Sequence, residues 1–170
     1  MVVLIVDGYN VIGAWPKLAA IRDRDLAQAR DLLIESLAEY QAYTGTKVII
    51  VFDAYSVHGV EKKHKSYKIE VIFTKENETA DERIEKLVGE VMNIKTQVYV
   101  ATSDYTEQRT IFAQGALRKS ARELVGEIED IQNEISQEVK ARTNVKAKTK
   151  IPLSKEVLEV FEKWRRGNYK

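Results

Sequence analysis

The chain opens with MVVLIVDGYN, residues 1–10, and the architecture of the protein can be inferred outward from this stretch. Residues 2–6 are apolar without alternation, which predicts a strand buried on both faces, as in a parallel sheet covered by helices. Asp7 ends the run, and the basic flank and small-residue cleavage site of a signal peptide are missing. We therefore expect a buried first strand in a cytoplasmic protein.

Further strands are predicted at three short segments rich in β-branched or aromatic residues, 47–52, 69–73 and 97–101. Between them, apolar residues recur at three- and four-residue spacing in 26–40 and again in 80–91, which indicates helices. Strands that alternate with helices predict an α/β fold with a mainly parallel central sheet flanked by helices.

Beyond the fourth strand we expect a helix over about 104–113, which stops near Gly115, and a longer helix over about 120–140. The segment TNVKAKTKIP at 143–152 lacks helical periodicity and is interpreted as a basic linker. A last amphipathic helix follows it, from Ser154 to near Gly167. The predicted organisation is thus one domain over 1–142, with a basic linker and a C-terminal helix over 143–170.

Composition limits the kinds of site and partner. The 170 residues suit one domain with an appendage, and no window approaches the ~20 apolar residues that span a bilayer, so no membrane partner is expected. Without cysteine, any metal must bind through oxygen or histidine. Residues 140–170 carry ten Lys and Arg against three acids, whereas residues 1–139 carry seventeen against twenty-three. A basic tail beside an acidic body is compatible with nucleic-acid binding or with an ordinary solvated surface.

Carboxylates stand where the predicted strands give way to helices. Asp7, with Asn10 close behind, follows the first strand, Asp53 the second and Asp104 the fourth, while Asp81 lies at the start of the helix after the third. The carboxyl ends of parallel strands share one edge of a sheet, where ligands bind in open α/β folds. We therefore expect these four aspartates to converge there.

Converging carboxylates repel one another unless a cation or a proton intervenes. Hard oxygen ligands select Mg²⁺ or Mn²⁺, and the reaction that such a site suits is hydrolysis of a phosphodiester. Each acid also has a structural alternative: Thr79 and Glu82 match a capping box, Asp81 suits a helix amino terminus, and Asp104 could be an N-cap. The recurrence of carboxylates at four junctions favours the metal site.

Aromatic and basic side chains could bind a nucleic acid. Tyr9 could stack on an unpaired base, although burial is the expected fate of nearby Trp15. The residues that could contact phosphates are Lys62, Lys63, Lys65, Lys68, Arg118, Lys119, Arg122, Arg165 and Arg166.

Five motifs, VDGYNVIGAWP, VFDAY, VIFTKENETADERIEKL, ATSDYTEQ and GALRKSAREL, closely resemble the YacP-like NYN-domain proteins of bacteria, which are relatives of PIN nucleases. The resemblance covers nearly the whole chain. It implies a parallel sheet, a requirement for Mg²⁺ or Mn²⁺, and endonucleolytic cleavage of RNA by Asp7, Asp53, Asp81 and Asp104 with help from Asn10. It further implies a ribosome-associated enzyme that cleaves mRNA during translation, in the decoding region.

Two other readings of the residues stay open. A phosphatase or phospho-acceptor domain that uses Asp7 or Asp53 as nucleophile fits poorly, because no second acid stands two residues after Asp7. A non-catalytic module that binds the ribosome or RNA would use the acids only as caps. In either case we expect a monomer without a small-molecule cofactor.

Overall fold

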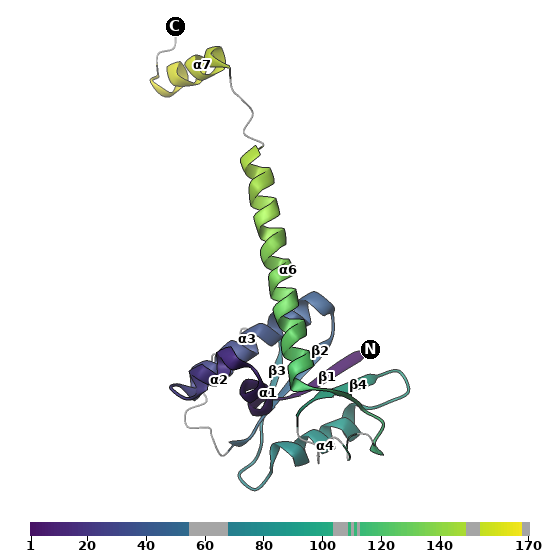
Figure 1. The fold of residues 1–170 in the computed structure, drawn as a ribbon. Coiled ribbons are helices and arrows are strands. Elements are labelled where there is room, and N and C mark those ends of the chain that lie inside the picture. Colours follow the sequence, from purple (N-terminus) through teal and green to yellow (C-terminus); the bar gives the residue numbers. More distant parts are fainter. Residues whose placement is uncertain (55–67, 104–108, 110, 112, 149–153, 168–170) are drawn as a thin grey trace. The chain divides into compact units, whose positions relative to one another are not determined.

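The computed structural model describes residues 1–54, 68–103, 109, 111, 113–148 and 154–167. Its centre is a five-stranded sheet with the order β3-β2-β1-β4-β5, in which every neighbouring pair is parallel (Figure 1). The strands are β1 (Val2–Asp7), β2 (Lys47–Phe52), β3 (Glu70–Phe73), β4 (Gln97–Ala101) and β5 (Leu117–Lys119). The predicted α/β class and parallel sheet are confirmed.

Helices cover both faces of the sheet (Figure 1). They are α1 (Gly8–Ala14), α2 (Pro16–Arg22), α3 (Leu26–Thr44), α4 (Ala80–Val91), α6 (Ala121–Lys148) and α7 (Lys155–Arg165). On one face, Leu4, Val6 and Ile50 pack with α1, α2, α3 and the first turns of α6. On the other, the alternate residues Val3 and Ile5 pack with α4. The continuous apolar runs of β1 and β2 follow from this double burial.

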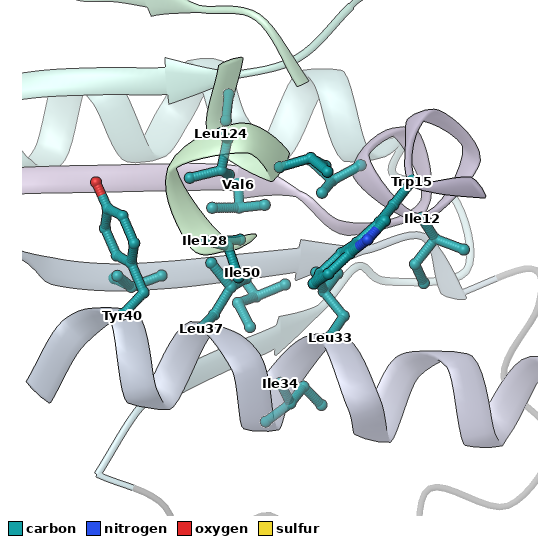
Figure 2. Packing of buried hydrophobic residues seen from close by; sticks show 14 of the residues in the cluster. Val6, Ile12, Trp15, Leu33, Ile34, Leu37, Tyr40, Ile50, Leu124 and Ile128 are labelled. Atoms are coloured by element: carbon teal, nitrogen blue, oxygen red, sulfur yellow. The ribbon is translucent and has the colours of Figure 1, made fainter. Parts of the chain in front are cut away.

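The first half of α6 packs on the α3 face of the sheet. Figure 2 shows Leu124 and Ile128 in the cluster that contains Leu37 and Ile50, and both α6 residues are buried. Side-chain hydrogen bonds join α6 to other elements around this core. They include Tyr40 Oη to Glu127 Oε2 at 2.9 Å, Trp15 Nε1 to Glu129 Oε1 at 3.0 Å, and Gln132 Nε2 to Ser36 Oγ at 3.3 Å. Trp15 is 2% exposed, which confirms its predicted burial.

One expectation about helix limits needs correction, and a second falls largely outside the described residues. The helix that begins at Ala121 continues to Lys148, so residues 143–148 are helical and not part of a linker. Alanine and lysine are good helix formers, and they can extend a helix without an apolar stripe. The helix expected over 104–113 falls largely outside the described residues, although Arg109, Ile111 and Ala113 are helical.

The chain packs as two compact units, Met1–Gln132 and Asn133–Lys170. This division concerns packing, so the functional boundary expected after residue 142 stays a prediction. In the second unit, α7 begins at the N-cap Ser154 as predicted and has no buried residue. Among the residues described, no helix is both long enough and apolar enough to span a bilayer.

Candidate nuclease site at the carboxyl edge of the sheet

Polar residues gather where the parallel strands end. Asp7 is the last residue of β1 and pairs in register with Val51, two positions before Asp53 on the neighbouring strand. Thr74 directly follows β3 and Thr102 directly follows β4. Since all these strands are parallel, the four positions lie along one edge, as expected for a ligand site in an open α/β sheet.

Asp7 is held by the turn that follows it. Its side chain is the N-cap of α1 and accepts a hydrogen bond from the Asn10 backbone N–H at 3.4 Å, and the residue is only 8% exposed. The next residue must be small, because a Cβ added to Gly8 would lie 2.3 Å from a ring carbon of Phe52. The Phe52 ring therefore packs directly on the backbone next to Asp7. Phe52 is also the residue that immediately precedes Asp53.

Asn10 connects the first junction to the fourth. Its Oδ1 accepts a hydrogen bond from the Ser103 backbone N–H at 2.9 Å. Ser103 is two residues beyond the end of β4 and is followed by Asp104, which lies outside the described residues. The Asn10 side chain thus has a clear structural task, which is to tie the chain after β4 to the start of α1.

Thr74 performs the equivalent task between the second and third junctions. Its Oγ1 accepts a hydrogen bond from the Ala54 N–H at 2.9 Å, and its own N–H donates to the Phe52 carbonyl at 3.0 Å. Both bonds hold the backbone on either side of Asp53. Sequence reasoning missed Thr74, although a threonine directly after a strand is a weak signal for such a bond.

Asp81 lies in the exposed first turn of α4. The capping box predicted beside it is confirmed, because Thr79 Oγ1 accepts from the Glu82 N–H at 3.2 Å and Glu82 Oε2 accepts from the Thr79 N–H at 3.1 Å. Glu82 is therefore a capping residue. Asp81 also benefits from the positive end of the helix dipole, so its position is compatible with both readings of its role.

Two of the acids at this edge fit a divalent ion. Within the described part of the chain, no three His, Cys, Asp or Glu residues form a group that could hold a metal ion. Mg²⁺, however, is commonly bound by one or two carboxylates, with water and substrate phosphate as the other ligands. Asp7 and Asp53, at the ends of adjacent parallel strands, are a donor set of that kind, so the residues present fit such an ion.

The predicted RNA contacts divide into four groups. Arg118 and Arg122 are exposed at β5 and the first turn of α6, and Lys68 is exposed before β3. Lys119, by contrast, is engaged within the protein: its Nζ lies 2.7 Å from both carboxylate oxygens of Glu127. In the second unit Arg165 and Arg166 each lie 3.4 Å from Glu162, and both are well exposed. Lys62, Lys63 and Lys65 lie outside the described residues.

Tyr9 is half-buried and its ring packs on Phe52, with ring centroids 5.1 Å apart. Its hydroxyl accepts a hydrogen bond from Arg30 Nη1 at 3.0 Å. Arg30 lies in the second turn of α3 and is only 5% exposed. Sequence reasoning missed Arg30, because it falls within an otherwise ordinary amphipathic helix.

The parallel sheet, its helical layers and the acidic edge define an α/β domain of the PIN-like nuclease class. The chain belongs to the family described as the YacP-like NYN domain, whose model matches residues 4–166, so the predicted membership is confirmed. It is 60% identical to the protein YacP of Bacillus subtilis (strain 168). The alignment spans 168 residues and covers 99% of each chain.

Solved structures of a relative agree with this assignment. The crystal structure of Rae1 (YacP) from Bacillus subtilis matches with a TM-score of 0.80 and 60% identity over 99% of this chain and 97% of that one. The W164L mutant of Rae1 matches with a TM-score of 0.75 and 56% identity, over 99% of this chain and 97% of that one. The family is of nuclease type, which accords with an acidic site at the sheet edge.

Proposed function

We propose that this protein is a divalent-metal-dependent endoribonuclease that cleaves mRNA on translating ribosomes. The observation that carries the proposal is the linked set of strand-end junctions. Asp7 ends β1, Asp53 directly follows the adjacent strand β2, and Asn10 bonds to Ser103, the residue before Asp104 in the sequence. Membership in a nuclease-type family supports hydrolysis of a phosphodiester as the reaction.

Asp7 and Asp53 would hold Mg²⁺ or Mn²⁺, and Asp81 and Asp104 would complete the acidic site. When bound, the ion supplies Lewis-acid activation of water and stabilises the leaving oxygen. Asn10 ties Ser103, two residues beyond β4, to the first turn of α1, which follows Asp7. No nucleophilic side chain is needed for this chemistry.

Exposed cations would position the messenger. Arg118 and Arg122 lie where β5 passes into α6, beside the carboxyl end of β4, and can contact phosphates without reading sequence. Arg165 and Arg166, with the other cations of residues 140–170, would bind ribosomal RNA in the decoding region, where counterion release favours association. The proposal includes a cytoplasmic, monomeric enzyme without a small-molecule cofactor.

The decisive experiment follows cleavage of a translated messenger in a reconstituted system with Mg²⁺, by mapping new RNA ends. Wild type is compared with Asp7→Asn and Asp81→Asn, and circular dichroism confirms that each variant is folded. We expect ends that require translation and vanish in both variants. Persistence of the ends in Asp7→Asn would contradict the proposal.

A second candidate is a non-catalytic module that binds RNA or the ribosome. The exposed arginines Arg118 and Arg122 favour this candidate, because they can bind phosphates whether or not the acidic edge catalyses a reaction. It predicts that folded Asp7→Asn protein keeps both ribosome binding and full biological activity.

A further inference from the structure

Burial of charge is concentrated around the first turn of α1. Within the residues that the structure describes, the only buried acidic residue is Asp7 and the only buried basic residue is Arg30. Both bond to the same turn, Asp7 through the Asn10 N–H and Arg30 through the Tyr9 hydroxyl. The two buried charges therefore bond to adjacent residues, Tyr9 and Asn10, in the first turn of the same seven-residue helix.

The position of Arg30 follows from the connection between the strands. Helix α3 leads into β2 after a short turn and packs against it, so the amino-terminal turns of α3 lie toward the edge where the strands end (Figure 1). The same helix contacts α1. Arg30 in the second turn of α3 thus reaches the residues that follow Asp7, and its bond to Tyr9 joins the two helices.

Stability alone does not account for an arginine at this position. An arginine keeps its positive charge across the physiological range, and withdrawing that charge from water is unfavourable. The neighbouring buried positions of α3, Ala29, Leu33 and Ile34, are apolar, and a methionine would fill similar space without this penalty. Arginine instead offers directed N–H donors, and Nη1 of Arg30 donates to the Tyr9 hydroxyl at 3.0 Å.

The Tyr9 ring transmits this constraint to the acids. It packs on the ring of Phe52, and that ring in turn lies against Gly8. Gly8 directly follows Asp7, and Phe52 directly precedes Asp53. A shift of Tyr9 would therefore move the backbone next to both aspartates.

We propose that Arg30 is a positioning residue for the acidic site, acting through the Tyr9 hydroxyl to fix the first turn of α1 and with it the Asp7 carboxylate. The proposal rests on the proposed function only in taking Asp7 as a metal ligand. Its direct consequence is that metal affinity depends on a hydrogen bond between two residues that do not bind the metal.

The test compares the full-length variants Tyr9→Phe and Arg30→Met with Tyr40→Phe. The control, Tyr40→Phe, also removes a partly buried tyrosine hydroxyl, in this case one that bonds to the Glu127 carboxylate. Tyr40 lies near the carboxyl end of α3, about three turns beyond Arg30 in the same helix. Mn²⁺ affinity is measured by electron paramagnetic resonance of the free ion, kcat and KM by cleavage of a translated messenger, and folding by urea titration.

We expect Tyr9→Phe and Arg30→Met to weaken Mn²⁺ binding by about 10- to 100-fold and to lower kcat with little change in KM, as for other residues that orient a ligand. The double variant should be no worse than the more severe single variant, because both single changes remove the bond between Arg30 and Tyr9. Tyr40→Phe should lose stability in urea without either effect.

If folded Tyr9→Phe binds Mn²⁺ as tightly as Tyr40→Phe does, the proposal is overturned. Tyr9→Phe alone decides the matter if Arg30→Met does not fold. Asp7→Asn separates the two claims. Cleavage that survives Asp7→Asn refutes the proposed function, whereas the Mn²⁺ titrations still decide the role of Arg30.

Discussion

Gly8 shows how one missing side chain shapes the acidic edge. A Cβ at this position would lie 2.3 to 2.9 Å from three atoms of the Phe52 ring, closer than van der Waals contact allows. Gly8→Ala should therefore displace either the ring or the turn after Asp7, at about 1–3 kcal/mol of unfolding free energy. Urea titration measures the loss, and Mn²⁺ affinity should fall with it.

Gly89→Ala is the matched control for that prediction. Gly89 lies inside α4, and nothing stands within 4 Å of an added Cβ. Alanine is a better helix former than glycine, so the same substitution should here stabilise the protein by about 0.5–1 kcal/mol. Destabilisation of both variants to the same degree would contradict the argument from the Phe52 contact.

Asn10 provides the second prediction at this scale. Asn10→Ala removes the acceptor for the Ser103 N–H, and the β4 junction loses its attachment to α1. Asn10→Asp keeps an acceptor oxygen in place. We expect mapped cleavage to fall about 10- to 100-fold in the alanine variant and less in the aspartate variant. Losses of this size are typical of residues that hold metal ligands in position without binding the metal themselves. Equal losses in the two variants would indicate that the amide N–H₂ matters instead.

Residue types alone suggested part of this candidate site. The aspartates were candidates because each stands at a predicted change from strand to helix, where the topology makes position informative. Arg30 and Thr74 were not, since their importance comes from bonds to Tyr9 and to Ala54, residues 21 and 20 positions away. No local pattern encodes a hydrogen bond across that distance.

Among the elements, Glu127 in α6 joins three others. It accepts from Tyr40 Oη of α3 and from Lys119 Nζ of β5, and the Lys119 ammonium lies 5.5 Å from the ring centroid of Tyr99 in β4. Burial, followed by the bond to Glu127 and its negative charge, raises the pKa of the Tyr40 hydroxyl well above its ordinary value.

That shift predicts an alkaline limit to stability. A tyrosine whose pKa is higher in the folded state stabilises the protein fully below the unfolded pKa of about 10, and this contribution is lost progressively as pH rises toward the folded value. The thermal midpoint of wild type should therefore fall between about pH 9 and pH 11. In Tyr40→Phe the fall should be shallower, as calorimetry across this range can measure.

Regular elements were predictable in proportion to their length and burial. The four expected strands lie within one residue of their predicted limits because each is a bounded apolar run. β5 was missed, since its three residues, Leu117–Lys119, are largely exposed and carry two cations. α1 and α2 have seven residues each, too few to establish a period. The extension of α6 to Lys148 was missed because its sequence there carries cations instead of an apolar stripe.

At the scale of the whole molecule, stability and partner binding are expected to reside in different segments. The core residues of the described part of the chain all lie in Met1–Gln132, and α7 buries no residue. A chain ended after Lys140 should therefore unfold within a few degrees of wild type, since a loss of about 1 kcal/mol corresponds to roughly 2–8 °C in domains of this size. It should also bind ribosomes more weakly, with a smaller dependence on salt, because cations are lost. Calorimetry and ribosome sedimentation at several salt concentrations provide the two measurements.

The strand order also has a consequence for biosynthesis. β1 is translated first but occupies the middle of the sheet, between β2 and β4. Its second edge can be covered only after residues 97–101 have been made, which takes roughly 5 to 20 seconds at the usual pace of elongation. For that interval a nascent chain exposes an apolar parallel strand without one of its partners. Chaperone capture during synthesis should accordingly be strongest before β4 emerges from the exit tunnel and decline once it has.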